Sequence, residues 1–275
     1  KNCVDFAINV DTGMALFGIP ACMGIKTKVI TWEHSNFYNN WGSKWFPYIR
    51  RFAARLSDAV VVLTERDKQN YEGNIVRCCK VITIGNPVES HKVNYFIESK
   101  TILSAGHLSP IKRFNLIPEI GRIVFERYPD WQWYICGEGP ERQLLEKKIS
   151  QFGLERNIIL TGPVKDMEKI YRSASMYVMT SEMEGLPMVL LEAKSYRLPI
   201  VSFDIMTGPS EIVRDGVNGY LVESGDITAM ADQICKLIEQ PLLRKRFSDA
   251  TVLDMNKFDR GEIIRQWENL LNQLS

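Results

Sequence analysis

The chain has 275 residues, a length that predicts one or two domains. Apolar residues make up 45% of the sequence and charged residues 24%, which is ordinary for a soluble globular protein. A formal net charge of +1 gives no global field, so composition argues against a nucleic-acid-binding protein or bulk electrostatic binding to a membrane.

No apolar run approaches the roughly 18 residues that a membrane-spanning helix needs. None of the six cysteines forms a CxxC pair, and Cys136 and Cys235 lie in apolar runs where a thiol acts as a small hydrophobe. With no signal peptide in the printed sequence, we expect reduced thiols and a cytoplasmic protein.

Short apolar or β-branched runs alternate with segments of helical spacing along the chain. The runs occupy residues 28–32, 59–64, 80–85, 101–106, 132–137, 157–162, 176–181 and 199–204. Most are continuously apolar, which is typical of parallel strands covered on both faces. This alternation predicts an α/β, doubly wound, Rossmann-like architecture.

Residues 86–100 begin with an Asn-Pro turn signal and lack a regular hydrophobic period, which predicts a linker. We therefore expect a partial Rossmann-like domain over residues 1–88, with three strands, and a complete one over residues 89–255. Residues 256–275 carry an amphipathic helix with no strand after it, which we expect to pack back towards the first domain.

The stretch "ITWEHSNFYN" places His34 at the end of a strand in the first half. Imidazole titrates near neutrality, so His34 could move a proton or contact a phosphate; a purely structural histidine is the alternative.

The predicted helix over residues 40–58 has two stripes. Its aromatic stripe is Trp41, Trp45, Tyr48, Phe52 and Leu56, and its basic stripe is Lys44, Arg51 and Arg55. We expect the aromatic stripe to pack in the core, with docking to a membrane surface as the alternative.

Three strand-end loops of the second half carry candidate ligand contacts. In "SAGHLSPIKRF" (104–114), His107, Lys112 and Arg113 suit a phosphate beside a helix start, or form a solvated basic turn. In "ICGEGPE" (135–141), Gly139 permits close backbone approach to a ligand, or makes a tight turn. In "LTGPVKDMEKIY" (160–171), Val164 can contact a flat base.

The stretch "TSEMEGLPMVLLEA" (180–193) places Pro187 in the first turn of a helix, Glu184 before it and Glu192 inside it. Amides over residues 186–189 could bind an anion while Glu184 reaches a hydroxylated group beyond it. An interior carboxylate such as Glu192 is costly unless hydrogen-bonded, and a ribose diol is a suitable partner. The alternative is a helix with Glu192 on its solvent face.

In their order, these segments resemble the donor-binding half of the retaining family 4 glycosyltransferases, also called glycosyl transferases group 1. "EGLPMVLLE" fits the family's E-x7-E element and "AGHLSPIKRF" fits its phosphate loop. "GEGPER", "LTGPVKDM" and "GPSEIVRDGVNGYLV" fit its remaining elements, whereas the first half matches more weakly through "ITWEHSNF" and "LSDAVVVLTE".

The resemblance implies a GT-B fold, in which two Rossmann-like domains hold a nucleotide sugar. It assigns the diphosphate to Lys112 and His107, the ribose to Glu192 and the base to Val164. It gives His34 and Glu184 catalytic roles towards the sugar. The donor-binding residues that it implies are His107, Lys112, Arg113, Gly139, Val164, Leu186, Pro187, Met188, Val189 and Glu192.

The sequence departs from the family pattern at three positions. His107 replaces the Arg of the phosphate loop, Arg113 replaces the following Gly, and Arg197 stands where a Gly normally ends the helix. The family's first strand and its Gly-rich loop are not found in the printed sequence, so a chain starting at Lys1 would have an incomplete cleft.

The function that we expect is a retaining, metal-independent hexosyltransferase acting in bacterial surface polysaccharide assembly. Its donor would be a nucleotide-diphosphate sugar, most simply a UDP-sugar, and its acceptor a glycan or lipid-linked hydroxyl. No cofactor and no nucleic acid partner is expected, and contact with the inner face of a membrane is an additional expectation. The alternatives are a non-catalytic sugar-nucleotide-binding fragment and a GT-B sugar-nucleotide epimerase, whose extra catalytic acids are not evident.

Overall fold

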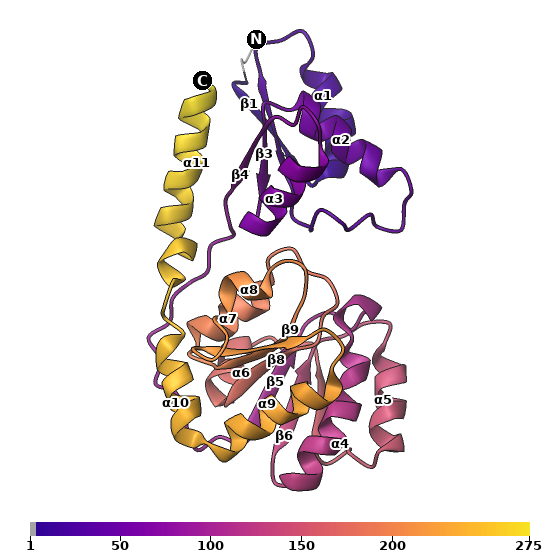
Figure 1. The fold of residues 1–275 in the computed structure, drawn as a ribbon, viewed down its shortest axis with the longest axis vertical. Coiled ribbons are helices and arrows are strands. Elements are labelled where there is room, and N and C mark those ends of the chain that lie inside the picture. The colour runs from indigo at the N-terminus through magenta and orange to yellow at the C-terminus, as the bar shows by residue number, and fades with distance from the viewer. Residues whose placement is uncertain (1–3) are drawn as a thin grey trace. The chain divides into compact units, whose positions relative to one another are not determined.

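The computed structural model describes residues 4–275, which form two compact units, each built on a parallel sheet (Figure 1). Unit 1 comprises the chain up to Pro87 together with Glu184–Leu186 and Asn256–Ser275. Unit 2 comprises Val88–Met183 and Pro187–Met255. The prediction of two Rossmann-like α/β units is confirmed.

Unit 1 contains a four-stranded sheet in the order β1-β2-β3-β4, with all pairings parallel. Its strands are β1 (Phe6–Val10), β2 (Lys28–Trp32), β3 (Ala59–Val62) and β4 (Lys80–Thr83). Its helices are α1 (Ala15–Cys22), α2 (Phe46–Leu56), α3 (Glu65–Asn74) and α11 (Arg260–Leu274).

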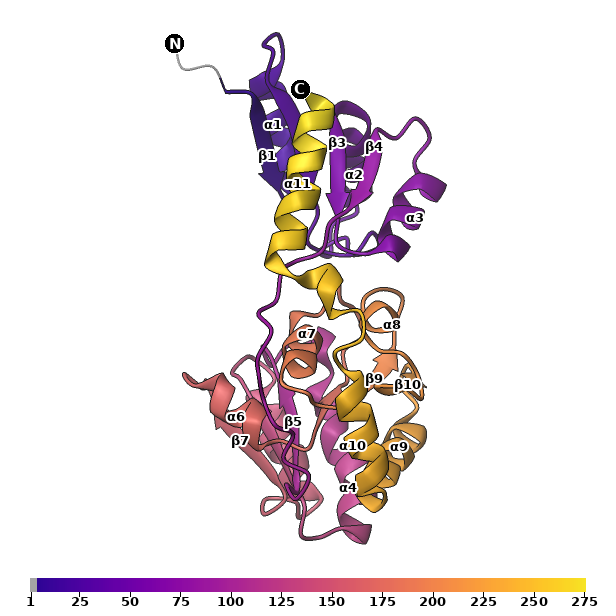
Figure 2. The same cartoon turned by 90° about the vertical axis from the view of Figure 1, so that its left-hand side faces the viewer.

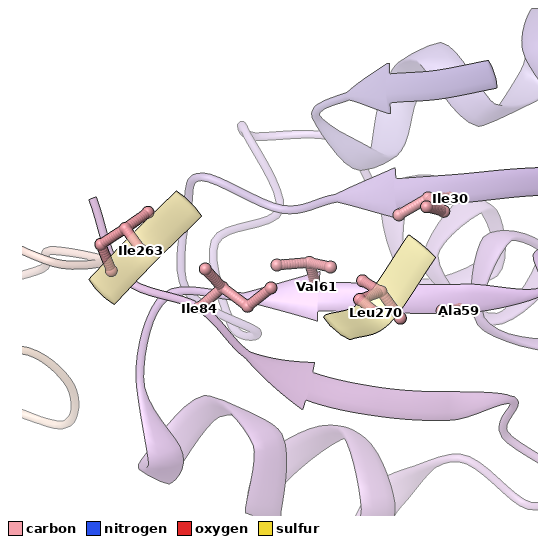
Figure 3. Close-up of a cluster of buried hydrophobic side chains, with 6 residues drawn as sticks. All are labelled: Ile30, Ala59, Val61, Ile84, Ile263 and Leu270. Atoms are coloured by element: carbon pink, nitrogen blue, oxygen red, sulfur yellow. The ribbon is translucent and has the colours of Figure 1, made fainter. Parts of the chain in front are cut away.

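Helices cover both faces of this sheet, which explains why its strands are continuously apolar. On β3, Val61 faces a cluster that includes Ile263 and Leu270 of α11, as Figure 3 shows. The neighbouring residues Val60 and Val62 point the other way, into a cluster with residues of α2 and α3. Because successive strand residues alternate between faces, all four residues of β3 are buried. Figure 2 shows α11 crossing the face opposite to α1 and α2.

Two expectations for unit 1 were wrong. The sheet has four described strands instead of three, because β1 was missed: its apolar run is interrupted by Asn9, and only one of its residues is fully buried. Helix α2 is also shorter than residues 40–58, and most of the aromatic stripe is not in the core, although Phe52 packs against a buried cluster. Trp41, Trp45 and Tyr48 are 65%, 64% and 62% exposed.

The face of α2 that packs inward consists of small residues and one arginine. Ala53 and Ala54 are buried and allow the helix backbone to approach the sheet closely. Arg50 is also buried, and its guanidinium stacks between Phe37 and Phe46 at 5.0 and 5.1 Å. It donates to the backbone carbonyl of Asn39 at 2.7 Å. Since these residues occupy the inner face, the aromatic side chains are directed outward.

Unit 2 contains a six-stranded parallel sheet in the order β10-β9-β8-β5-β6-β7. Its strands are β5 (Thr101–Ala105), β6 (Gln132–Cys136), β7 (Ile158–Gly162), β8 (Met176–Met179), β9 (Ile200–Asp204) and β10 (Gly219–Glu223). Its helices are α4 (Ile117–Arg127), α5 (Arg142–Gln151), α6 (Met167–Ser173), α7 (Met188–Ser195), α8 (Pro209–Ile212), α9 (Ile227–Glu239) and α10 (Pro241–Ala250). Every strand predicted in this half is present, and β10 is an additional strand. Helices α4 and α9 lie on one face of the sheet, and α6 and α7 on the other (Figure 1).

Two arginines of unit 2 stand in left-handed backbone conformation. Arg113 has φ +50° and Arg197 has φ +66°. These are the two positions at which the family pattern has glycine, and the backbone explains why, since only glycine adopts this region without steric cost.

We expect Arg197→Gly to stabilise unit 2 by about 0.5–1 kcal/mol. Relief of the left-handed strain, about 1–2 kcal/mol, exceeds the extra backbone entropy that glycine loses on folding, about 0.4–1 kcal/mol. Urea unfolding followed by circular dichroism would measure the change. Arg197→Ala is the matched control, because it removes the same side chain and keeps the strain. Equal stability of the two variants would contradict the prediction.

Over residues 4–275, no helix is both long enough and apolar enough to span a bilayer.

Candidate functional site

The chain order of unit 2 creates a switch point between β5 and β8. From β5 the chain moves to β6 on one side, and from β8 it moves to β9 on the other. The loops that leave these two strands therefore diverge, and ligands of doubly wound sheets bind in the crevice between such loops. Two contacts join the loops here: the amide of Glu182 donates to the carbonyl of Ile111 at 2.8 Å, and Thr180 Oγ1 donates to the carbonyl of Lys112 at 2.9 Å.

Backbone contacts also connect the loops after β5 and β6. The amide of Leu108 donates to the carbonyl of Glu138 at 2.9 Å, and the amide of Glu141 donates to the carbonyl of Leu108 at 2.9 Å. A Cβ atom at Gly139 would lie 2.5 Å from the Leu108 carbonyl oxygen. The backbone at Gly139 approaches that of the phosphate loop closely, and an approach to a ligand stays a prediction. Gly139 thus shapes the loop that carries His107.

The three cations predicted for the loop after β5 have different surroundings. His107 is exposed, and Lys112 is half-buried at the end of a short 3₁₀ turn, Pro110–Lys112. Arg113 pairs with Glu182 of the β8 loop, with Nε 3.3 Å from the carboxylate. Since both side chains of that pair are partly exposed, its contribution to stability is small, about 0–1 kcal/mol. The Arg113 guanidinium is therefore already paired with a carboxylate of the neighbouring loop.

The predicted carboxylate Glu192 lies on α7 and is half-buried. Its Oε2 accepts a hydrogen bond from the hydroxyl of Tyr171, on α6, at 2.8 Å. Tyr171 is 2% exposed. Glu192 is therefore neither fully buried nor fully on the solvent face, since one carboxylate oxygen is bound by a buried hydroxyl. Sequence reasoning missed Tyr171, which lies at the end of the quoted stretch "LTGPVKDMEKIY".

Helix α7 begins directly after Pro187, which is its N-cap residue with extended backbone. The first-turn amides of any α-helix lack intrahelical partners, and those at Met188 and Val189 fall in this class. Together with the helix dipole they favour an anion at this end of α7.

Val164 is half-buried in the loop between β7 and α6. Val164 and the first-turn residues Met188 and Val189 belong to unit 2, as does Glu192.

His34 belongs to unit 1 and is separated from the end of β2 by Glu33. Its ring lies 4.3 Å from that of Trp32, and its Nε2 is buried with no hydrogen-bond partner among residues 4–275. Burial lowers the pKa of His34, and the nearby charge of Asp11 acts weakly in the opposite direction. His34 is therefore neutral at pH 7, with a polar nitrogen available to a ligand or to the reacting groups.

The neighbouring Glu33 is a structural residue, fully buried beside His34. It accepts hydrogen bonds from the hydroxyl of Thr12, from the hydroxyl of Tyr71 at 3.3 Å and from the amide of Ser35 at 3.0 Å. Burial raises the pKa of Glu33, and the Thr12 and Ser35 bonds oppose that rise. The carboxyl thus connects the turn after β1 to the end of β2, which fixes the backbone that carries His34.

Glu184 stands with unit 1, together with Gly185 and Leu186. The Nδ2 of Asn36 donates to the backbone carbonyl of Glu184 at 3.0 Å, and a Cβ atom at Gly185 would lie 2.5 Å from the carbonyl oxygen of His34. The two residues with predicted catalytic roles, His34 and Glu184, therefore come from neighbouring backbone segments of the same unit. The E-x7-E element is divided, since Glu192 belongs to unit 2.

The chain matches the family model of the glycosyl transferases group 1 over residues 88–252. This is more than half of its length, and the chain therefore belongs to that family. It is 31% identical to an uncharacterized glycosyltransferase of Haemophilus influenzae over 98% of this chain and 76% of that protein. It is 33% identical to the amylovoran biosynthesis glycosyltransferase AmsD of Erwinia amylovora over 82% of this chain and 65% of that protein.

Solved structures show the same fold. The crystal structure of TarM superposes with a TM-score of 0.87 at 27% identity, covering 97% of this chain and 54% of TarM. The chain thus spans about half of TarM, and it spans 50% of the 32% identical poly(ribitol-phosphate) alpha-N-acetylglucosaminyltransferase of Staphylococcus aureus.

Within residues 4–275, no group of three or more His, Cys, Asp or Glu side chains is arranged to hold a metal ion.

Proposed function

We propose that the protein transfers a sugar from a UDP-sugar to an acceptor hydroxyl with retention of the anomeric configuration. The observation that carries the proposal is Glu192: a half-buried carboxylate at the switch point of a doubly wound sheet, held through one oxygen by Tyr171. Its Oε1 has no hydrogen bond within residues 4–275, and a ribose diol supplies the donors that such an oxygen accepts.

The proposed diphosphate contacts are Lys112, His107 and the first-turn amides of α7. When the bond between the anomeric carbon and the β-phosphate oxygen breaks, negative charge grows on the diphosphate. Fixed cations and helix dipoles that face this charge lower the barrier because they need no reorganisation. This arrangement requires no metal ion to neutralise the leaving group. Val164 is proposed to contact the uracil, and His34 and Glu184 the transferred sugar.

In the proposed step, the acceptor hydroxyl oxygen bonds to the anomeric carbon on the face from which the diphosphate departs. The hydroxyl proton passes to the departing β-phosphate oxygen. The products are the glycosylated acceptor and UDP, with no change in oxidation state.

The relatives support a surface-glycan acceptor. AmsD is described as acting in amylovoran biosynthesis, and the S. aureus relative acts on poly(ribitol-phosphate). A TarM variant from S. aureus has been crystallised with UDP and alpha-GlcNAc-glycerol. We therefore propose a glycan, lipid-linked glycan or polyol-phosphate chain as the acceptor, in bacterial polysaccharide assembly on the cytoplasmic side of the membrane.

A nucleotide and nucleotide-sugar panel tests the proposal. Thermal shift should show stabilisation by UDP and by one UDP-sugar, and proton NMR of the product with that donor should show retained configuration, with and without EDTA. Failure of every nucleotide to bind the folded protein would overturn the proposal. Binding without turnover on any acceptor would favour the non-catalytic sugar-nucleotide-binding fragment, and conversion of the free UDP-sugar into its epimer would favour the epimerase.

A surface of unit 1 supports a second element of the proposal, contact with an anionic membrane. The surface, called the aromatic patch, consists of Trp41, Trp45 and Tyr48. Lys44 lies over the Trp45 ring at 5.8 Å, and Arg51 lies over the Tyr48 ring at 5.8 Å. Exposed aromatic rings interleaved with cations are typical of segments that insert at the headgroup level of anionic bilayers. We propose that the aromatic patch binds such a surface.

Replacing Trp41 and Trp45 together by Ala is expected to lower binding to phosphatidylglycerol vesicles about 10-fold or more, because two large rings no longer insert. Co-sedimentation with phosphatidylglycerol and with phosphatidylcholine vesicles measures this, and the wild-type protein should prefer the former. Phe96→Ala is the matched control, because it removes an exposed aromatic residue of unit 2, outside the patch. Equal binding of the wild-type protein to both vesicle types would contradict the proposal, as would undiminished binding of the double variant.

A further inference from the structure

Tyr171 donates a hydrogen bond to Glu192 and has no role of its own in the proposed transfer. The two residues are 21 positions apart on different helices, and the Tyr171 hydroxyl lies 2.8 Å from Oε2 of Glu192. Burial raises the pKa of the Tyr171 hydroxyl far above its ordinary value, with the neighbouring Tyr177 and Glu192 acting in the same direction. The hydroxyl therefore keeps its proton across the physiological range and is always a donor to the carboxylate.

The Tyr171 ring stacks with two other tyrosine rings. Tyr196 lies parallel to it at 5.0 Å, and Tyr177 stacks with it at 6.3 Å with an interplanar angle of 25°. His91 extends the stack, parallel to Tyr196 at 4.2 Å. A buried tyrosine packed against two rings presents its hydroxyl at one place, since moving the ring would break these contacts.

Tyr177 connects this stack to the start of the phosphate loop. Its hydroxyl accepts from the amide of Ala105 at 3.0 Å and donates to the carbonyl of Ala105 at 3.0 Å. Ala105 is the last residue of β5, and Gly106 and His107 follow it. The stack therefore contacts both the proposed ribose ligand Glu192 and the backbone that begins the proposed phosphate loop.

We propose that Tyr171 is a positioning residue for nucleotide binding: its hydroxyl holds Oε2 of Glu192 so that Oε1 is directed to the ribose hydroxyls. Without the hydroxyl, the carboxylate would occupy several rotamers, and binding would cost the entropy of ordering them. The inference rests on the proposed role of Glu192 towards the ribose. It predicts an effect that depends on the diol of the ligand and not on the base or the phosphates.

The experiment compares UDP with 2′,3′-dideoxy-UDP by titration calorimetry in the wild-type protein, Tyr171→Phe and Glu192→Ala. In the wild-type protein, loss of the two hydroxyls is expected to weaken binding about 10- to 100-fold. In Tyr171→Phe, binding of UDP should weaken about 5- to 10-fold while binding of dideoxy-UDP stays unchanged. The phenylalanine ring keeps the stack, so unchanged dideoxy-UDP binding also shows that the variant site is folded.

Tyr196→Phe is the matched control. It removes a hydroxyl from the adjacent ring of the same stack, and no hydrogen bond to that hydroxyl occurs within residues 4–275. UDP binding should be unchanged in this variant. In enzyme assays, Tyr171→Phe should raise KM for the UDP-sugar and leave kcat within about twofold, a split that general loss of folded protein does not produce.

The outcomes separate the inference from the proposed function. If wild-type and Glu192→Ala proteins bind UDP and dideoxy-UDP equally well, the role of Glu192 towards the ribose fails, and the inference fails with it. If Glu192→Ala removes the preference for the diol and Tyr171→Phe retains it in full, only the role of Tyr171 fails.

A second measurement keeps the hydroxyl in place and so avoids any folding defect. With 3-fluorotyrosine at position 171, the ¹⁹F resonance should shift when UDP is added and remain unchanged with 2′,3′-dideoxy-UDP. An equal shift with both ligands, or none with UDP, would contradict the inference.

Discussion

Glu192→Ala is expected to raise the dissociation constant for UDP by about 10- to 100-fold. Hydrogen bonds to an ionised group are worth about 1.5–3 kcal/mol, and the variant also leaves the buried hydroxyl of Tyr171 without its carboxylate partner. Calorimetric titration with UDP measures the change. Glu146→Ala on α5 is the matched control, since it removes an exposed carboxylate of unit 2 that pairs only with Arg142 at the surface. A change of less than twofold in Glu192→Ala would refute the assignment of the ribose to Glu192.

Glu184→Ala is expected to reduce transfer instead of nucleotide binding, with kcat lowered about 100-fold and the dissociation constant for UDP within about twofold. Its proposed partner is the transferred sugar. Losing one contact that forms with the transition state costs about 2.7–4 kcal/mol, and a 100-fold loss of kcat corresponds to the lower end of that range. Initial rates at saturating donor measure kcat. Glu184→Gln, which retains a hydrogen-bonding carbonyl, should recover part of the loss. Near-wild-type kcat in Glu184→Ala would show that the sugar does not depend on this residue.

The sequence predicted most strands of unit 2 because they are largely apolar runs in a sheet that helices cover on both faces. Ile102, Leu103 and Ser104 of β5, for example, are all buried. The same criterion missed β1. In this strand Ile8 and Val10 are exposed, and Phe6 and Ala7 are half-buried. Continuous apolarity therefore detects central strands and fails where burial is one-sided or incomplete.

The aromatic stripe of α2 shows a second limit of sequence patterns. Large apolar side chains at helical spacing indicate a face of a helix, and they do not say which face meets the sheet. Ala53 and Ala54 take the inner face because small side chains let the helix lie close to the strands, and the buried Arg50 is stabilised by rings that the sequence does not place beside it. The buried face thus depends on tertiary packing.

For the candidate site, the sequence placed Lys112 and His107 in a loop that follows a strand and Glu192 inside the helix after another strand, and the structure has them there. It could not reveal Tyr171 as the partner of Glu192, because that contact requires α6 and α7 to be neighbours on one face of the sheet. Likewise, the sequence could not show that residues 184–186 pack with unit 1, since that depends on contacts with the loop carrying Asn36.

Helix α11 has a consequence for the order in which the protein is made. Ile263 and Leu270 fill the core of unit 1 against Val61 and Ile84, and the chain between these segments forms all of unit 2. A ribosome therefore completes unit 2 before it releases the residues that close the first core. Synthesis proceeds at about 5–20 residues per second. One apolar face of the unit 1 sheet therefore stays uncovered for roughly ten seconds or more. Until then, the residues that α11 covers in the folded protein, Val61 and Ile84 among them, stay accessible to solvent.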